Sequence, residues 1–412
     1  MDRRTLIRTG GMAAIGLGVS ACASRVATRL TSARPRVNLP PVNIAWDRII
    51  RTTVGLRPHR PSGFVVKVAK LDEKTIVHNY GHGGAGMSLS WGTGSLATDF
   101  AMDHGDRNAA VIGSGVVGLT AARQLQRRGF TVTIYAMAVP PDTTSNMSLA
   151  GFTPMSGLID RDKHTPEWDA QFLRAADIAY RQLQLLVGAH YGVSWVDQYS
   201  PTDAMQPPNP NAPALSTASL LVGQVILQPG EHPFPQRYAS KRPTLRIEPS
   251  IYLDALMRDF MMFGGRLVIR KFDTPADMMS IDERLIVNCT GLGSRTLFGD
   301  EELIPLKGQL TLLIPQAEIL YSTNGGARST NNSPGGGGFV HMMPRADGIA
   351  LGGTSQRGIW TLEPDEDERK RVVDTHIALF NAMHPLAPGE HVPAPVIPDA
   401  TPSLESHFDL ES

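Results

Sequence analysis

Residues 109–118, AAVIGSGVVG, are the stretch that decides the fold. Four apolar residues predict a short buried strand, and the glycines that follow form a GxGxxG turn that opens a helix. In such a turn Gly113 permits the tight bend, Gly115 lets the backbone approach a pyrophosphate, and Gly118 allows the helix to pack closely on the strand. The helix N-terminus then offers free N–H groups and partial positive charge to the phosphates. We therefore expect a dinucleotide-binding domain.

The sequence around this motif completes the start of a βαβ unit. The helix is expected to run through Arg128, and a second strand is expected at Thr131–Tyr135. The position after that strand, where a carboxylate usually binds the adenosine ribose, reads Ala-Met-Ala at 136–138. This weakens a generic nicotinamide interpretation and leaves ribose recognition unassigned.

The totals fit a soluble enzyme. The chain has 412 residues, which is enough for two domains with large cores. Lys and Arg together number 39, as do Asp and Glu, so no overall charge attracts nucleic acid. We single out no metal site.

Residues 1–30 are expected to be an export signal. Arg3-Arg4 resembles a twin-arginine signal, and the apolar stretch Gly10–Ala23 is too short to span a bilayer. The pattern predicts a protein exported to the periplasm or anchored at the membrane. Residues 31–41, rich in Pro and Arg, are expected to form a tether without structure.

Only two cysteines are present, Cys22 and Cys289, so a disulfide framework is not expected. Residues 19–22 read Val-Ser-Ala-Cys, which resembles a lipobox in which Cys22 would carry the lipid anchor. A plain cleaved signal with an incidental cysteine is the alternative.

Several separate motifs resemble those of the D-amino-acid oxidase family. The resemblance covers roughly residues 42–385. The matching stretches are 111–119, 143–145 with 150–152, 287–291, 307–309, 351–353 with Trp360, and, most specific, GLRPHRP at 55–61 and HNYGHGGAG at 78–86. The resemblance implies an α/β fold, with an FAD-binding Rossmann-like domain and a second, mixed or antiparallel-sheet substrate domain.

The order of these motifs differs from that of the family. There, the arginine motif and the HNYGHGG turn close the chain, whereas here residues 55–61 and 78–86 come first. A circular permutation explains this order, with a helix at 87–102 joined to the first strand through residues 103–108. A rearranged or chimeric reading frame is the alternative.

The permuted order implies a division of the chain. The expected segments are an FAD-binding domain at 42–154, a substrate domain at 155–240, further FAD-binding residues at 241–298, further substrate-domain residues with a lid at 299–365, a helix at 366–385 and a loose tail at 386–412. The lid is the Gly/Ser/Asn-rich stretch 324–338.

The resemblance also assigns the cofactor site. The residues that would bind FAD are Gly113, Ser114, Gly115, Gly118, Thr143, Thr144, Ser145, Gly151, Phe152, Thr290 and the run Gly83, Gly84, Ala85, Gly86, Met87 and Ser88. Gly84 and Gly86 would let backbone donors reach the flavin ring without a side chain in the way. Such donors stabilise charge that develops on the ring during reduction.

The substrate residues implied by the resemblance are Arg57, Gly84, Thr153 and His341. Arg57 matches the family arginine that binds the substrate carboxylate through two parallel hydrogen bonds. A structural ion pair is the alternative for Arg57, and it suits Arg60 better. His82 is expected to be a structural histidine of the turn rather than a catalytic base.

The lid departs from the family pattern. His341 stands where a tyrosine commonly helps to hold the carboxylate, and a second tyrosine is replaced within residues 335–338. His341 either donates to a carboxylate itself or faces solvent in a loop. The changed lid puts the usual substrate range in doubt.

The resulting prediction is an FAD-dependent oxidase of D-amino acids or related amino acids, with dioxygen reduced to hydrogen peroxide. A membrane-anchored dehydrogenase that passes electrons to a quinone is a second hypothesis. A non-catalytic flavoprotein or ligand-binding lipoprotein is a third.

Overall fold

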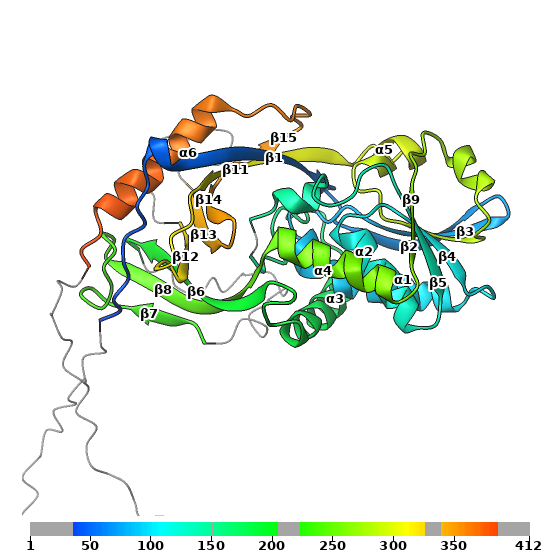
Figure 1. Cartoon of the computed structure of the whole chain (residues 1–412), viewed down its shortest axis with the longest axis horizontal. Helices are drawn as coiled ribbons and strands as arrows, with labels where there is room; N and C mark the ends of the chain where they lie inside the picture. Colours follow the sequence, from blue (N-terminus) through cyan, green and yellow to red (C-terminus); the bar gives the residue numbers. More distant parts are fainter. Residues whose placement is uncertain (1–35, 150, 205–222, 326–338, 386–412) are drawn as a thin grey trace, which may run out of the picture. The chain divides into compact units, whose positions relative to one another are not determined.

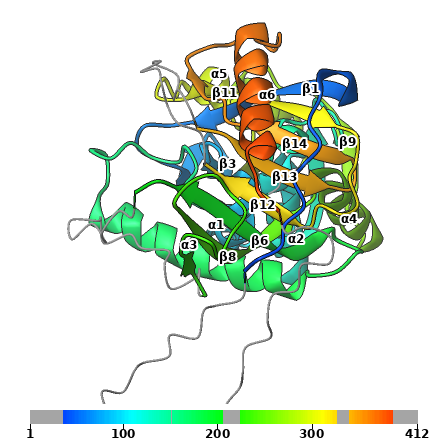
Figure 2. The same cartoon turned by 90° about the vertical axis from the view of Figure 1, so that its left-hand side faces the viewer.

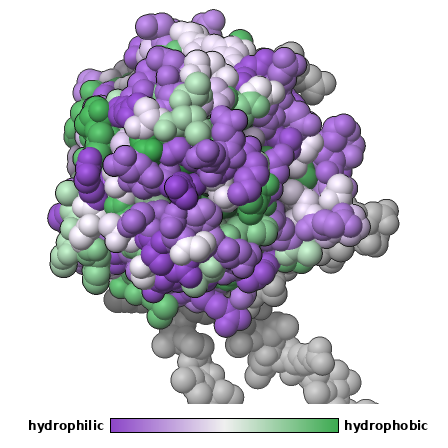
Figure 3. All heavy atoms as spheres, turned by 90° about the vertical axis from the view of Figure 1, so that its right-hand side faces the viewer, coloured by the Kyte–Doolittle hydropathy of each residue, from purple (hydrophilic) through white to green (hydrophobic). Residues whose placement is uncertain are grey.

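A computed structural model describes residues 36–149, 151–204, 223–325 and 339–385. The predicted signal, most of the predicted lid and the predicted tail lie outside these residues, so export, lipidation at Cys22 and the lid stay predictions. Within the described ranges, no helix is both long and apolar enough to cross a bilayer. The face at the right-hand end of Figure 1 carries mostly hydrophilic side chains with smaller hydrophobic areas between them (Figure 3).

A six-stranded sheet carries the glycine motif. Its strands, in spatial order, are β2 (Val65–Leu71), β3 (Lys74–Tyr80), β10 (Leu285–Asn288), β4 (Asn108–Ile112), β5 (Thr131–Ala136) and β9 (Arg266–Ile269). All neighbours are parallel except β2 and β3. Every residue of β3 and β10 is buried, as expected for parallel strands covered on both faces. The predicted strands at 109–112, 131–135 and 285–288 are confirmed.

Helices cover one face of this sheet (Figure 1). They are α1 (Gly86–Met102), α2 (Val116–Arg127), α3 (Pro166–Leu185) and α4 (Pro249–Met262), and they share one hydrophobic core with the strands. A smaller core on the opposite face includes residues of α5 (Gly293–Phe298) and of the 3₁₀ helix Pro275–Ser280. The helices that the sequence predicts at 87–102 and after the glycine turn are confirmed.

A nine-stranded sheet forms the other part of the described chain. In spatial order its strands are β1 (Ile49–His59), β11 (Ile304–Leu313), β14 (Gly348–Gly352), β13 (His341–Arg345), β12 (Tyr321–Asn324), β6 (Val193–Thr202), β8 (Tyr238–Ile247) and β7 (Val225–Leu227), while β15 (Gln356–Arg357) pairs with β11. All neighbouring strands of this sheet run antiparallel except β12 and β6, which are parallel. The mixed sheet that the resemblance implies is therefore confirmed.

The two faces of this sheet differ. One face packs a hydrophobic core against α6 (Glu366–Asn381) and the segment before the 3₁₀ helix Trp46–Arg48 (Figure 2). The other face carries Arg57, and it meets the 3₁₀ helix Thr144–Met147, because a Cβ added to Gly55 would lie 3.0 Å from Cβ of Met147. We call this side of the nine-stranded sheet the Arg57 face. The strand register shows which residues lie on it.

Three of the predicted domain boundaries differ from the division of the chain between the two sheets. Strand β1, grouped at 42–154 with the cofactor domain, is an edge strand of the nine-stranded sheet. Strand β8 runs through the limit at 240/241, and α3, grouped with the substrate domain, packs on α1. The end of the expected tether is packed rather than free, since Leu39 is buried beside Val42.

Candidate functional site

The glycines of the GxGxxG turn hold the backbone in a conformation that side chains would block. Gly113 has a φ of 108°, and a Cβ there would lie 2.6 Å from the Cys289 carbonyl oxygen. A Cβ on Gly118 would lie 1.9 Å from the Gly113 carbonyl oxygen. The turn bends and the helix packs against it as the sequence predicted.

The start of α2 presents backbone donors. Gly115 is its N-cap, and the Val116 N–H donates to Oγ of Ser145 at 3.0 Å. Within the described residues, the N–H groups of Gly115 and Val117 have no acceptor. These free donors at a helix N-terminus suit a pyrophosphate.

Hydroxyl groups predicted to bind the cofactor are partly used within the protein. Ser114 Oγ donates to the Ala138 carbonyl oxygen at 2.6 Å, and Thr143 Oγ1 donates to Oδ1 of Asn146 at 2.7 Å. Thr290 Oγ1 lies 2.8 Å from both Asn288 Oδ1 and Ser294 Oγ. Ser114 lies in the glycine turn, and the Thr290 N atom lies 3.7 Å from the position of a Cβ on Gly113. The hydrogen bonds of these hydroxyls order the loops in which they lie.

The HNYGHGG turn lies between β3 and α1 and uses several of its own donors. The Gly83 N–H donates to the Pro58 carbonyl oxygen at 2.8 Å, and the Gly84 N–H donates to the Ser156 carbonyl oxygen at 2.8 Å. The expectation that Gly84 offers its N–H to a flavin is therefore not supported. The N–H groups of Gly86 and Met87, at the start of α1, have no acceptor in the described part of the chain and are the donors that remain.

Pro58 of the arginine motif contacts the HNYGHGG turn and the segment that follows β10. Its carbonyl oxygen accepts from Gly83, and its ring lies 3.7 Å from the position of a Cβ on Gly291. A Cβ on Gly86 would lie 3.7 Å from Val116 at the start of α2, and the Thr153 N–H donates to Oγ of Ser88 at 2.7 Å. The fold thus brings together segments that are far apart in the sequence.

Residues 151–153 border the Arg57 face. Gly151 forms an isolated bridge with Arg246, and a Cβ there would lie 3.6 Å from Cε of Met343. Phe152 is buried, and its N–H donates to the Leu245 carbonyl oxygen at 2.9 Å. This segment links α1 to the nine-stranded sheet.

The Arg57 guanidinium is held by neutral acceptors. Nε donates to the Leu306 carbonyl oxygen at 3.0 Å, and Nη2 donates to the Thr354 carbonyl oxygen at 3.3 Å and to Ser355 Oγ at 3.2 Å. Burial lowers the pKa of Arg57 to about 10. Among the described residues Arg57 forms no ion pair and Nη1 has no acceptor, so the structural ion-pair alternative is not supported.

The neighbouring Arg60 behaves differently. It pairs with Asp300 at 3.0 Å and with Glu302 at 3.2 Å, and Asp300 also accepts from the Tyr80 hydroxyl at 2.8 Å. The structural role predicted for Arg60 is confirmed.

His82 is a structural histidine, as predicted. It is 2% exposed, its Nε2 lies 2.9 Å from Thr93 Oγ1, and its ring stacks on Phe64. Burial lowers the pKa of His82 to about 3, so the imidazole is neutral at pH 7.

His341 does not face solvent, which corrects one of the two expectations for it. It begins β13, where its ring fills the space beside Gly352, and its Nδ1 is buried without a partner among the described residues. Burial, together with His376 and Arg57, lowers the pKa of His341 to about 3. His341 is therefore a neutral group on the Arg57 face, and Arg57 is near enough for its charge to act on the ring.

Buried histidines make the folded state sensitive to acid. Burial lowers the pKa of His82 to about 3 and of His376 to about 4, whereas the unfolded chain titrates near 6.5. Each contributes stability above pH 6.5 that is lost as pH falls toward its folded pKa, by about 1.4 kcal/mol per pH unit. We expect the melting temperature to fall steeply between pH 6.5 and 5, and less steeply in His82→Gln. His190, whose side chain is exposed, is the control position, and an equal slope in His82→Gln would contradict the assignment.

Three residues that position Arg57 were not predicted from the sequence. Gly308 lies beneath the guanidinium, because a Cβ there would lie 3.3 Å from Nε of Arg57. Thr354 and Ser355 follow β14 and accept from Nη2. The sequence motifs at 307–309 and 351–353 include or adjoin these residues. Only the pairing of β1, β11 and β14 shows that they contact Arg57.

The residues present fit FAD. The free N–H groups at the start of α2 suit the pyrophosphate, and those at the start of α1 lie in the segment predicted to bind the ring. A Cβ on Gly115 would meet only Ser145 Oγ within 4 Å, so the backbone there is open to a close approach. Ala136–Ala138 still offer no carboxylate to the ribose, and Met137 is 74% exposed.

Comparison with known proteins gives one family. Residues 108–408 match the family described as FAD dependent oxidoreductase. The chain is 28% identical to human D-aspartate oxidase over 284 residues, which is 67% of this chain and 76% of that protein. It is 24% identical to the D-amino acid oxidase of Dugesia ryukyuensis, over 66% of this chain and 78% of that protein.

Solved structures show more distant likenesses. Iminodiacetate oxidase from Chelativorans sp. BNC1 aligns with a TM-score of 0.44 and 14% identity, covering 68% of this chain and 81% of that one. Glycine oxidase from Bacillus cereus aligns with a TM-score of 0.45 and 13% identity, covering 68% and 80%.

Proposed function

Since the chain belongs to the FAD-dependent oxidoreductase (DAO) family, with FAD as its cofactor, we propose that it oxidises D-amino acids to imino acids. When bound, FAD supplies a two-electron acceptor that dioxygen regenerates with release of hydrogen peroxide. The Cα hydrogen leaves the substrate as a hydride and the amino nitrogen loses a proton. Water then hydrolyses the imino acid to a 2-oxo acid and ammonia.

The Arg57 guanidinium is the observation that carries this proposal. It is partly buried and charged, and the described residues supply it with no carboxylate. An uncompensated guanidinium in such a place costs free energy that a bound carboxylate offsets. Leu306, Thr354 and Ser355 fix two of its nitrogens, so the remaining nitrogen is oriented before a substrate arrives.

The neutral histidines agree with a reaction that depends on alignment. The buried His82 ring is hydrogen-bonded to the Thr93 hydroxyl, so His82 is not available as a base. The lowered pKa of His341 keeps its imidazole neutral at pH 7. Hydride transfer needs the Cα–H bond to point at the ring more than it needs acid–base catalysis. The names of the relatives, D-aspartate oxidase and D-amino acid oxidase, support the choice of amino acid and of the D configuration.

The first test is the spectrum of the purified holoenzyme. Under anaerobic conditions we expect D-amino acids to bleach the flavin absorbance, while the L-enantiomers leave it unchanged. Readmitted air should restore the absorbance and release one peroxide per amino acid consumed.

Two outcomes would change this proposal. Bleaching that only a quinone reverses would make the protein a dehydrogenase. A flavin that no amino acid bleaches would favour the non-catalytic hypothesis.

A further inference from the structure

Arg57 stands in one row with a second arginine, across three neighbouring strands. Leu306 of β11 lies opposite Arg57 of β1 on one side and opposite Arg357 of β15 on the other. Paired residues share a face of a sheet, so both arginines lie on the Arg57 face with Leu306 between them. The two arginines differ in their partners. Neutral acceptors hold Arg57, whereas the Asp160 carboxylate holds Arg357.

Asp160 binds Arg357 through two hydrogen bonds. Nη1 of Arg357 donates to Oδ1 at 3.2 Å, and Nη2 donates to Oδ2 at 2.9 Å, so the guanidinium and the carboxylate meet edge to edge. The hydrogen bonds from Arg357 hold the pKa of the Asp160 carboxyl below its ordinary value. His59, two residues after Arg57 in β1, places its Nε2 3.4 Å from Oδ1 of the same carboxylate. Asp160 therefore links β15 to β1.

Residues 156–160, which we call the Asp160 segment, lie between the HNYGHGG turn and the Arg57 face. The Gly157 carbonyl oxygen accepts from Nδ1 of His59 at 2.9 Å. The same oxygen would lie 1.8 Å from a Cβ on Gly83, and a Cβ on Gly157 would lie 2.7 Å from Cδ2 of Leu306. The segment is thus in close contact on both sides.

The acceptors that fix the Arg57 guanidinium adjoin the groups that Asp160 holds. Nε of Arg57 donates to the carbonyl oxygen of Leu306, whose side chain packs against the Asp160 segment. Nη2 donates to the Thr354 carbonyl oxygen and to Ser355 Oγ, and these two residues directly precede β15. Since β15 is only two residues long, an anchor at its second residue limits how far the acceptors before it can shift.

We propose that Asp160 and Arg357 are positioning residues for the substrate carboxylate: their ion pair fixes β15 and the Asp160 segment, and thereby the acceptors that orient Arg57. This inference rests on the proposed function and adds to it two residues that act through Arg57. A guanidinium whose acceptors shift loses its alignment with a carboxylate, and small misplacements of a binding group have large effects.

The exposure of the pair separates positioning from stability. The side chains of Arg357 and Asp160 are 48% and 31% exposed. Ion pairs this exposed contribute little to the free energy of unfolding. Loss of the pair should therefore leave the melting temperature nearly unchanged, so that a change in ligand binding reports on the orientation of Arg57.

The test compares the binding of hexanoate and of hexanamide, its uncharged counterpart, to the holoenzyme by calorimetry. We expect Arg357→Met to weaken hexanoate binding roughly threefold to tenfold and to leave hexanamide binding unchanged, a smaller loss than removal of Arg57 itself would cause. Asp160→Asn should have the same effect. The double variant should lose no more than either single variant, because each substitution removes the same pair.

Turnover of D-norleucine gives a second measurement. We expect KM to rise in Arg357→Met by the same factor as the hexanoate dissociation constant, while kcat stays within about twofold, because the carboxylate is held equally before and during hydride transfer. Arg357→Lys, which keeps a charge that can reach Asp160, should recover part of the loss.

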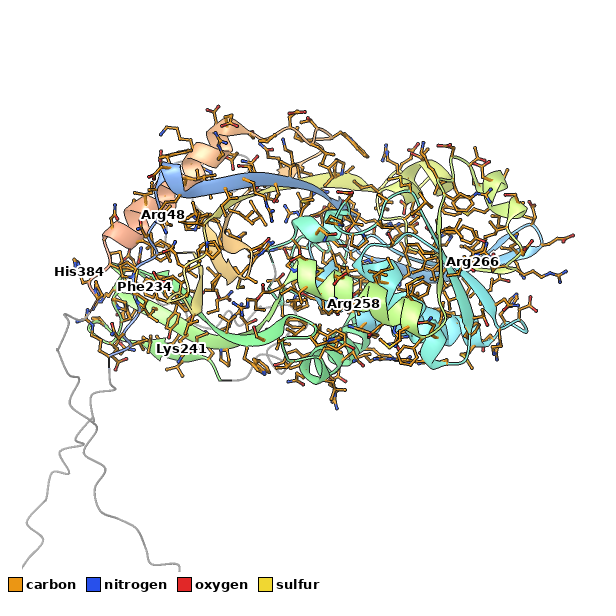
Figure 4. The ribbon with its side chains drawn as sticks, in the orientation of Figure 1. Arg48, Phe234, Lys241, Arg258, Arg266 and His384 are labelled. Atoms are coloured by element: carbon orange, nitrogen blue, oxygen red, sulfur yellow. The ribbon has the colours of Figure 1, made fainter. Side chains whose placement is uncertain are left out.

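Arg258→Met is the matched control. Arg258, labelled in Figure 4, pairs with Asp254 at 2.6 Å on α4, and its side chain is 54% exposed. Its removal should change neither ligand's affinity. Three results would overturn the proposal: hexanoate affinity that Arg357→Met leaves unchanged, an equal fall in the control or for hexanamide, and a double variant whose loss is the product of the two single losses.

Hexanoate has no amino group, so its binding needs no turnover. Weakened hexanoate binding in Arg357→Met and Asp160→Asn, without oxidation of any D-amino acid, would sustain the positioning pair and refute the proposed function. Oxidation of D-norleucine with one hexanoate affinity in all variants would do the reverse. Should Asp160→Asn lose its flavin, the comparison of Arg357→Lys with Arg357→Met decides, and equal hexanoate affinities in these two would overturn the proposal.

Discussion

Arg57→Met is expected to lower kcat/KM for D-amino acids by roughly 30-fold to 4,000-fold while flavin binding is retained. The loss of a charged partner from a partly buried pair costs about 2–5 kcal/mol, and each 1.4 kcal/mol is tenfold. Methionine keeps most of the length of the side chain that passes over Gly308, so the sheet should remain packed. The fall in kcat/KM should come mainly from a higher KM, because the arginine holds the α-carboxylate equally before and during hydride transfer.

Two comparisons make this expectation specific. Arg57→Lys keeps the charge but not the bidentate geometry, and it should recover part of the loss. Arg60→Met removes the pairs with Asp300 and Glu302, so it should lower the melting temperature and leave KM nearly unchanged. A flavin-loaded Arg57→Met enzyme with an unchanged KM would show that the carboxylate binds elsewhere.

Local motifs were predictable from the sequence because their physics is local. Gly118 packs against the Gly113 carbonyl oxygen five residues earlier, and Gly113 has the positive φ that the tight bend requires. The strand and helix around them follow from a short apolar pattern. His82 was also interpreted correctly, since its ring is satisfied by Thr93, which lies two helix turns into the helix that follows the glycine turn. These residues needed no knowledge of distant pairing.

Long-range features were not predictable in the same way. Helix α3 was not anticipated, although its capping residue Thr165 accepts from the Trp168 N–H, and its packing on α1 moves it away from the predicted substrate domain. The hydrogen bonds of Arg57 with Thr354 and Ser355 carry no signal in the sequence, because only the pairing of β1, β11 and β14 brings these residues together. The burial of His341 likewise depends on Gly352, which is a neighbour in the sheet and not in the chain.

The permuted order of motifs stays a proposal with some structural support. The family match begins at residue 108, after β1, β3 and α1. Yet β3 fills a position in the six-stranded sheet beside β10, and β1 pairs along its length with β11. Elements before the matched region thus complete both sheets, as a permutation requires.

Gly118→Ala is expected to abolish the folded flavoprotein. The added Cβ would lie 1.9 Å from the Gly113 carbonyl oxygen and 2.8 Å from its carbonyl carbon, and both are backbone atoms that cannot swing aside. Overpacking of this kind costs about 1–3 kcal/mol where side chains yield, and more where the backbone must move. Because α2 would have to shift away from the turn, its free N–H groups would also leave the pyrophosphate. We therefore expect a low soluble yield of colourless protein.

The same substitution at Gly105 provides the control. A Cβ there would meet nothing within 4 Å, and Gly105 is not among the described glycines with positive φ, so Gly105→Ala should keep the flavin and the melting temperature. Gly105 lies just before β4, and Gly118 lies in the first turn of α2, so a difference between the two variants isolates the contact of Gly118 with Gly113. A Gly118→Ala protein with full flavin absorbance and an unaltered melting temperature would contradict this expectation. It would mean that α2 tolerates displacement and that FAD binding does not depend on the contact of Gly118 with Gly113.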